Sequence, residues 1–375
     1  MRRGLTRAAK AIGGVLLFAV IALCLAPTLV PPFLDRIYYS GPVSDHFDGA
    51  HFFNPGEPTP ERIDPRRFLN RWAQGERATW PDSVPVQPSR PPARVSGEQM
   101  LVTWIGQSTV LVQTRGINIL TDPIWSDRAS PVSFAGPSRV RTPGARFEDL
   151  PHIDLVLVSH NHYDHLDLPT LQRLSARDRP LIVTSLGNDT ILRGAGIESR
   201  AFDWGGGMNL SCDAQPAPAP ADHPAIPPCA VTVERVHHWG SRWGTDRNRA
   251  LWSGFSVRLP GGNLFFAGDT GWGDGSWVRE AARHGPYRFA ILPIGAYRPR
   301  EVMQGSHVDP TQSVDIFQAL NPVRALGVHW GTFQLAFEGI DDPPRDLAAA
   351  LARAGIAPDR FVTTEVGRSF TVPIR

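Results

Sequence analysis

A short run in the middle of the chain carries side chains that could bind a metal. His160, His162, Asp164 and His165 lie within six positions, directly after an apolar run at residues 153–158. Imidazole and carboxylate groups suit Zn²⁺ and similar divalent cations. An apolar run of this length predicts a buried strand that ends where these groups begin. The sequence therefore predicts a metal site at a strand end, with a chance histidine-rich turn as the weaker alternative.

Three further groups that could bind a metal follow predicted strands later in the chain. Asp269 follows residues 264–267, His329 follows residues 324–328, and the pair His237 and His238 follows residues 231–236. Loops at strand ends commonly carry catalytic and binding residues, because a rigid sheet positions them. Adjacent side chains at a strand end point in opposite directions, so we expect only one of the two neighbouring histidines to reach the site.

The elements that must position these residues form two groups. Short β-branched or apolar runs separated by turn residues predict a strand meander at residues 101–120, and strands then alternate with helices. Further strands are expected at residues 153–158, 181–184, 231–236, 253–259, 264–267, 290–293, 324–328 and 361–363. Helices are expected at residues 168–175, 189–195, 310–320 and 344–354. This order predicts two sheets packed face to face with helices outside.

The first 34 residues differ from the rest of the chain. Four basic residues within positions 2–10 precede an apolar stretch centred on residues 12–26, and Pro27, Pro31 and Pro32 are expected to end it. This pattern predicts a membrane anchor that places the body of the protein on the extracytoplasmic side, or else a signal segment removed on secretion. Residues 35–96, rich in proline, are expected to form an extended arm before a domain at residues 97–375.

Composition and cysteine content narrow the class of protein. Apolar residues make up 42% and charged residues 20% of the 375 positions, as in an ordinary globular core. The net charge is only +2 and the basic residues are dispersed, which argues against a nucleic-acid partner.

Cys212 and Cys229 flank a loop rich in proline and alanine. A disulfide between them would stabilise the fold by roughly 3 kcal/mol, and two free thiols are the alternative.

The central motif resembles the H-x-H-x-D-H signature of the metallo-β-lactamase superfamily. The later histidine, the Gly-Asp-Thr segment and the final histidine follow in that family's order, so the resemblance covers about residues 100–335. It implies an αββα sandwich, a class of mixed α and β structure. The branch that hydrolyses N-acylphosphatidylethanolamine as a phospholipase D is similar at residues 44–48, 52–55, 159–167, 265–271, 294–300, 307–310 and 329–333.

The resemblance implies a centre of two zinc ions that share a water molecule. The ligands of the first ion would be His160, His162 and His238, and those of the second Asp164, His165 and His329, with Asp269 bridging the two. The family's pattern places the ligand directly before an aromatic residue, which selects His238 over His237. Asp164 and Asp269 are therefore expected to be catalytic residues as well as ligands.

Residues beside the ligands have expected roles of their own. The resemblance makes His307 a catalytic candidate that contacts a phosphate or assists the leaving group. Asp309 precedes a proline at the start of a predicted helix, where it is expected to be the N-cap. Asp167 is expected to orient a ligand histidine from behind. Trp239 and Trp330 adjoin ligands and could line a slot for an acyl chain.

The resemblance implies a metal-dependent hydrolase, with a phosphoric diester favoured as substrate. A phospholipid of the N-acylphosphatidylethanolamine type is the expected substrate, and the expected anchor would hold the site close to a membrane. A hydrolase of the same fold that acts on lactones, amides or other phosphodiesters is the alternative, because fold does not determine function. A non-catalytic envelope protein is a remote alternative, since every ligand of the family's pattern is present in this sequence.

Overall fold

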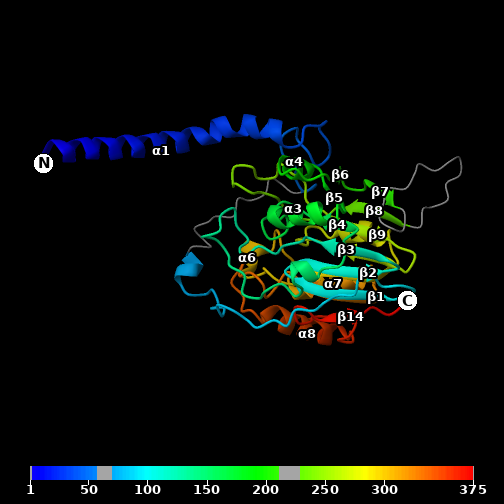
Figure 1. Cartoon of the computed structure of the whole chain (residues 1–375). Coiled ribbons are helices and arrows are strands. Elements are labelled where there is room, and N and C mark those ends of the chain that lie inside the picture. Colours follow the sequence, from blue (N-terminus) through cyan, green and yellow to red (C-terminus); the bar gives the residue numbers. More distant parts are fainter. Residues whose placement is uncertain (1, 57–69, 211–228, 375) are drawn as a thin grey trace.

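Two facing sheets form the body of the protein (Figure 1), and the computed structural model describes residues 2–56, 70–210 and 229–374. Along the first sheet the strand order is β14-β1-β2-β3-β4-β5-β6. Its strands are β1 (Met100–Gly106), β2 (Thr109–Thr114), β3 (Ile117–Thr121), β4 (Leu155–Val158), β5 (Leu181–Ser185), β6 (Arg200–Phe202) and β14 (Ser369–Thr371). The meander β1-β2-β3 is antiparallel, whereas β3, β4, β5 and β6 run parallel.

The second sheet repeats this mixture of antiparallel and parallel pairs. Its strand order is β13-β12-β11-β10-β9-β8-β7, and β10 to β13 run parallel. Its strands are β7 (Gly207–Leu210), β8 (Cys229–Glu234), β9 (Gly254–Arg258), β10 (Asn263–Phe266), β11 (Tyr287–Pro293), β12 (Arg324–Val328) and β13 (Phe361–Val362). Parallel strands end at the same edge of a sheet, so the loops after β10, β11 and β12 are neighbours.

The alternation of side chains along β4 explains why its sequence is apolar throughout. Leu155 and Leu157 belong to the large core between the two sheets, whereas Val156 and Val158 belong to a second core outside the first sheet. Successive strand side chains point to opposite faces, and both faces of this strand are covered. The strand that precedes the metal-binding motif is therefore held rigidly from both sides.

Helices cover the outer faces of both sheets. α3 (Leu168–Arg177) packs Leu171 and Leu174 into the outer core of the first sheet, and α4 (Asn188–Gly194) adds Leu192. The helices α5 (Ser276–Ala282), α7 (Pro310–Leu320) and α8 (Asp342–Ala354) contribute to the core of the second sheet. Short helical segments occur at α6 (Arg300–Met303) and at a 3-10 turn, Phe147–Asp149. The expected sandwich of two sheets with helices outside is confirmed.

Several elements were not anticipated by the sequence pattern. The strands β6, β7 and β14 have at most four residues each and lie at sheet edges, and β14 pairs with β1 from the other end of the domain. α5 and α6 are also too short to show a clear helical period. Tertiary packing rather than local sequence therefore determines these elements.

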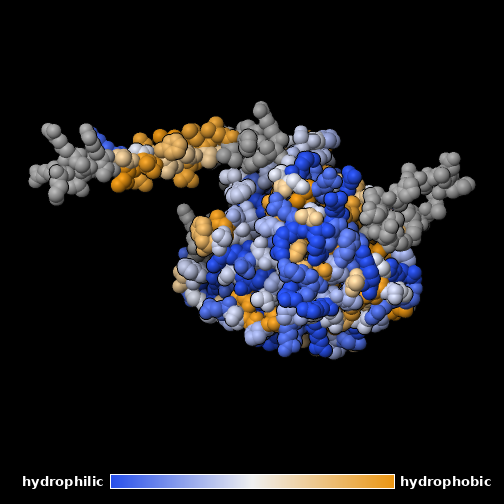
Figure 2. Space-filling model, viewed as in Figure 1, coloured by the Kyte–Doolittle hydropathy of each residue, from blue (hydrophilic) through white to orange (hydrophobic). Residues whose placement is uncertain are grey.

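The N-terminal segment forms one long helix, α1 (Arg2–Ile37), which extends away from the body (Figure 1). It continues through Pro27, Pro31 and Pro32, so the prolines that follow the apolar stretch do not end the helix. A proline removes one backbone hydrogen bond and can bend a helix without ending it. Apolar side chains such as Phe18 and Leu23, each 73% exposed, cover this helix (Figure 2). No helix in the described part of the chain is both long and apolar enough to cross a membrane, so the expected membrane anchor is not supported.

The described parts of the arm are attached to the body by both polar and apolar contacts. The hydroxyl of Tyr38, directly after α1, donates to Asp246 Oδ2 at 2.6 Å. Phe47 and Phe52 are buried in the core between the sheets. The expected disulfide involves Cys212, which lies outside the described residues, so it stays a prediction.

Candidate metal centre

The loop after β4 carries four of the candidate ligands in a tight turn. The backbone amides of His165 and Leu166 both donate to the carbonyl oxygen of His162, at 3.1 and 2.9 Å. This turn aims His160, His162, Asp164 and His165 at the region between the two sheet edges. The remaining candidates come from the other sheet: Asp269 from the loop after β10, His329 from the end of β12, and His238 from the loop after β8.

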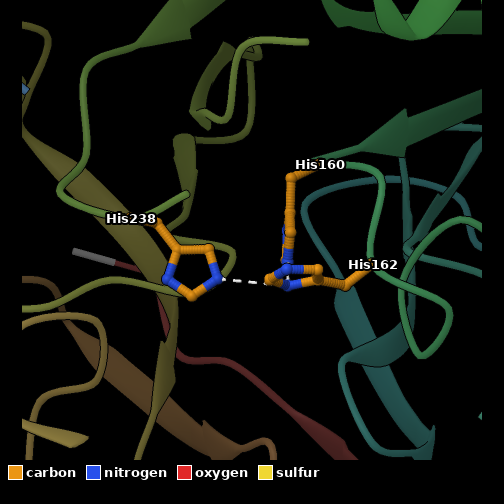
Figure 3. Close-up of side chains that lie close together, drawn as sticks. All are labelled: His160, His162 and His238. Carbon is orange, nitrogen blue, oxygen red and sulfur yellow. Dashed lines mark hydrogen bonds between the residues drawn. The ribbon is translucent and has the colours of Figure 1, made fainter. Parts of the chain in front are cut away.

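Three histidines form a first cluster. Figure 3 shows the rings of His160, His162 and His238 converging from two separate segments of the chain. Nδ1 of His162 lies 2.8 Å from Nε2 of His160 and 3.4 Å from Nε2 of His238. All three groups offer a ligand atom within 4.8 Å of the others. Three imidazoles at this spacing can hold one zinc ion and leave a fourth position open.

Two carboxylates and two histidines form a second cluster beside the first. Asp164 Oδ2 lies 3.1 Å from Nε2 of both His165 and His329. Asp269 Oδ2 lies 3.2 Å from Nε2 of His165 and 3.0 Å from Nε2 of His329. All four residues are buried. This set of nitrogen and oxygen donors again suits a divalent cation.

Asp269 lies between the two clusters. In addition to its contacts within the second cluster, its Oδ2 atom lies 3.9 Å from Nε2 of His238 in the first. The side chain is 2% exposed, so water does not screen it from either set of imidazoles. Its position is the one that a ligand shared by two cations would occupy.

The two clusters differ in the protonation of their histidines. Burial lowers the pKa of His162 to about 4 and also holds the pKa values of His160 and His238 well below normal, so these imidazoles are neutral at pH 7. Burial also acts to lower the pKa of His329, but Asp269 and Asp164 outweigh it and raise that pKa to about 9. The two carboxylates therefore place negative charge in the site. A bound cation would neutralise this charge in place of the proton on His329.

Unpartnered atoms in the site also fit a metal. In the described residues, His162 Nε2 and Asp269 Oδ1 are buried without a hydrogen-bond partner. A buried polar atom without a partner is costly unless a ligand or ion satisfies it. The residues present therefore fit bound divalent cations on geometry, charge and donor chemistry.

Two supporting residues were missed by sequence reasoning. Asp122 accepts hydrogen bonds from Ser159 Oγ at 2.6 Å and from its backbone amide at 2.7 Å, and Asp122 Oδ2 lies 2.6 Å from His165 Nδ1. Gln107 donates from Nε2 to Asp164 Oδ2 at 2.9 Å. A partner on one ring nitrogen determines which nitrogen of a histidine is free for a metal. In the sequence, the role of Asp122 is indicated only by its place directly after β3. The strand β3 pairs with β4, which precedes the ligands.

His307 lies at the same edge of the site. Its Nδ1 is 3.9 Å from Asp269 Oδ2, and its ring stacks on that of His329 with centroids 5.4 Å apart. Burial lowers its pKa to about 4, so it is neutral at pH 7. Asp309, two residues later, accepts from the Gln312 backbone amide in a capping box that begins α7, which confirms its expected capping role.

Other expectations about residues near the site have different outcomes. The carboxylate of Asp167 binds Ser126, Thr170 and the Trp125 amide, so the expectation that it orients a ligand histidine is wrong; Asp122 has that position instead. Its place at the start of α3 explains this, because the chain has turned away from the site there. His237 pairs with Gly271 through an isolated bridge and is absent from the clusters of ligand atoms.

The two tryptophans beside the ligands differ in their surroundings. Trp239 packs edge-on against His162, with ring centroids 4.2 Å apart, and is only partly buried. Trp330 is buried against Trp104 and also lines a cavity of about 860 Å³ together with Arg141 and the segment after β13. A slot for an acyl chain beside either residue stays a prediction.

A two-sheet sandwich with histidine and aspartate ligands at one edge defines a metallo-β-lactamase-like hydrolase. Comparison with known proteins agrees, since residues 117–330 match the family described as "Beta-lactamase superfamily domain". The chain belongs to this superfamily, and the resemblance found in its sequence is confirmed. It is a metal-dependent hydrolase.

Two curated relatives are similar over most of this chain. The N-acyl-phosphatidylethanolamine-hydrolyzing phospholipase D 1 of Caenorhabditis elegans is 33% identical over 277 residues, which cover 72% of this chain and 74% of that protein. The mitochondrial protein of the same activity from Saccharomyces cerevisiae is 33% identical over 270 residues, which cover 71% of this chain and 55% of that protein. The chain therefore spans little more than half of the yeast relative.

Solved structures share the fold at lower identity. The metallo hydrolase Igni18 of Ignicoccus hospitalis is 20% identical, with a TM-score of 0.54 over 74% of this chain and 100% of that one. An isothiocyanate hydrolase from Delia radicum gut bacteria is 17% identical, with a TM-score of 0.55 over 73% and 99%. These likenesses concern the fold alone.

Proposed function

We propose that the protein is a dinuclear zinc phosphodiesterase of the phospholipase D type. It cleaves N-acylphosphatidylethanolamine-like phospholipids with water and releases phosphatidic acid and an N-acylated amine. The observation that carries the proposal is the position of Asp269 between a cluster of three histidines and a cluster that contains Asp164. Two clusters joined by one carboxylate are typical of sites in which paired cations act on a phosphodiester.

Two of the close groups of ligand atoms support a division of the residues between two ions. The first ion would be held by His160, His162 and His238, the second by Asp164, His165 and His329, and both by Asp269. When bound, the two ions would activate a water molecule and neutralise charge on the substrate phosphate. Zinc is supported by the donor set, which consists of imidazoles and carboxylates.

His307 has the place of a group that contacts the substrate. Its Nδ1 atom is buried without a hydrogen-bond partner among the described residues, and its ring faces Asp269. Its low pKa makes it a neutral imidazole at pH 7, so we assign it a hydrogen bond with the phosphate rather than storage of a proton. Loss of this contact alone would slow the reaction without removing either ion.

Exposed apolar residues support a lipid substrate. Phe134, in the loop between β3 and β4, is 82% exposed, and Trp243, in the loop after β8, is 64% exposed. Trp243 stands next to Tyr163 of the metal-binding motif, with ring centroids 6.4 Å apart. Exposed aromatic side chains suit a lipid–water interface. The phenyl ring of Phe134 can enter the apolar layer, and the indole of Trp243 has an N–H group for the polar layer. With the apolar surface of α1 (Figure 2), they would contact a lipid surface.

The test is an analysis of lipid products by mass spectrometry. The purified protein is incubated with a total lipid extract, with and without a chelator, and in parallel with a panel of lactones and amides. We expect phosphatidic acid and N-acylethanolamines to appear only without chelator. Hydrolysis of a lactone or an amide without any release of phosphatidic acid would replace the proposed function by that of another hydrolase of this fold.

A further inference from the structure

One exposed cation stands beside the first cluster of ligands. The guanidinium of Arg247 lies over the ring of Trp239, with Cζ 4.0 Å from the ring centroid. The same indole packs edge-on against the metal-ligand candidate His162, at 4.2 Å between centroids. A single aromatic ring therefore contacts both this positive charge and a candidate ligand of the metal centre.

The loop that carries Arg247 is closed and held in place. The Asn248 amide donates to the Gly240 carbonyl at 2.7 Å, and the Gly240 amide donates back to Asn248 Oδ1 at 3.3 Å. Inside this loop, the buried carboxylate of Asp246 accepts from the amides of Arg242 and Trp243. These hydrogen bonds fix the backbone on both sides of Arg247. The Cα atom of Arg247 is therefore held in place, and its side chain extends from there to Trp239.

Arg247 differs from the other arginines near the site in having no carboxylate or carbonyl partner. Arg242 donates to the carbonyl oxygens of Asn161 and Leu166, each at 2.9 Å, and Arg300 donates to that of His307 at 2.8 Å. In the described part of the chain, no hydrogen bond or salt bridge engages Arg247, and only its contact with the indole is present. Its planar set of donors is therefore available to a ligand.

We propose that Arg247 recognises the anionic phosphodiester of the substrate and so selects charged diesters over neutral esters, amides and lactones. This inference rests on the proposed function. A guanidinium can donate two parallel hydrogen bonds to phosphate oxygens, and stacking on an indole fixes the plane of the fork. The positive charge of Arg247 would add to that of the two metal ions. The combined charge would attract an anionic diester but not a neutral ester.

The first test measures anion binding without turnover. Dibutyl phosphate, a soluble diester, and inorganic phosphate are titrated calorimetrically into the metal-loaded full chain. We expect Arg247→Gln to weaken the affinity for dibutyl phosphate about tenfold or more, as for the loss of a charged hydrogen bond, while Arg247→Lys keeps part of it. Arg353→Gln, an exposed arginine on α8, is the matched control and should bind as the wild type does.

The second test measures selectivity in turnover. For N-acylphosphatidylethanolamine in mixed micelles, Arg247→Gln should raise KM about tenfold with a much smaller change in kcat. An unchanged melting temperature and metal content would separate this effect from loss of structure. Equal affinity of wild type and Arg247→Gln for dibutyl phosphate would overturn the inference, as would a loss of affinity confined to inorganic phosphate. If the wild type binds the diester through Arg247 but releases no phosphatidic acid, the proposed function fails and the recognition of phosphodiesters stands.

Discussion

Asp122 shows how strongly this site depends on residues that bind no metal themselves. Its buried carboxylate binds Ser159 at two points and lies within hydrogen-bond distance of Nδ1 of His165, which directs Nε2 of that ring to Asp164 and Asp269. A local motif made the ligands recognisable from the sequence. Asp122 and Gln107 belong to ordinary strand ends, and only the folded sheet brings them to the ligands, so the sequence could not assign them this role.

Replacing Asp122 by asparagine should weaken metal binding. The amide keeps the size of the side chain but offers an N–H group to Ser159 or His165, where only an acceptor fits. Loss of such a supporting partner typically costs about tenfold to a hundredfold in metal affinity. Competition with a chromogenic chelator would measure this. Asp154→Asn, which changes a buried carboxylate before the start of β4, is the control and should leave metal affinity unchanged.

Elements with a continuous apolar or amphipathic pattern could be predicted best. The bounds of β12 and α7 agree with the predicted ranges, because each has a continuous apolar or amphipathic pattern and α7 has a proline start and an aspartate cap. The edge strands β6, β7 and β14 lack such patterns, since their pairing partners supply most of the stabilisation. The length of α1 could not be predicted, because the prolines after its apolar stretch do not end the helix.

The arm is attached through a histidine between two carboxylates. His46 Nδ1 lies 2.6 Å from Asp45 and Nε2 lies 2.7 Å from Asp203, while the ring stacks on Trp204. Burial acts to lower the pKa of His46, but the hydrogen bonds to Asp203 and Asp45 outweigh it and raise the pKa. The arm is therefore bound most firmly when this ring is protonated.

This linkage predicts a pH dependence of the arm. A raised folded-state pKa gives stabilisation that is complete below the unfolded value of about 6.5 and lost as the pH rises through the folded value. We expect hydrogen exchange at residues 44–53 to become faster as the pH rises above about 6.5, beyond the intrinsic increase. His46→Gln should remove this extra dependence. An identical pH profile for wild type and variant would show that the charge of His46 does not hold the arm.

For the whole molecule, the structure places the chemistry and the apolar surface on separate parts of the chain. The metal centre is built from both sheets, whereas the exposed apolar residues of α1 lie on a helix that extends from the body (Figures 1 and 2). The superfamily and the sandwich could be predicted from the sequence, because ligand order and strand order are both linear features. The position of Asp269 between the two clusters depends on how the two sheets face each other. The sequence suggested this position only through the resemblance to the superfamily.

Removal of α1 should separate binding to lipid from catalysis. A variant that lacks residues 2–34 keeps Tyr38 and its bond to Asp246. We expect it to sediment with phospholipid vesicles much less than the full chain, because the apolar side chains exposed on α1 are gone. Its kcat on a soluble phosphodiester should stay within about twofold of the wild type, by the additivity of distant sites. Undiminished sedimentation would show that α1 is not the lipid contact.

The metal content of the purified protein tests most directly whether two cations share Asp269. Elemental analysis by inductively coupled plasma mass spectrometry is carried out on wild type and Asp269→Ala, each reconstituted with zinc and freed of excess. We expect about two zinc ions per wild-type chain, with a lower content and lost activity in the variant. One ion per wild-type chain, or full occupancy and activity in Asp269→Ala, would contradict it.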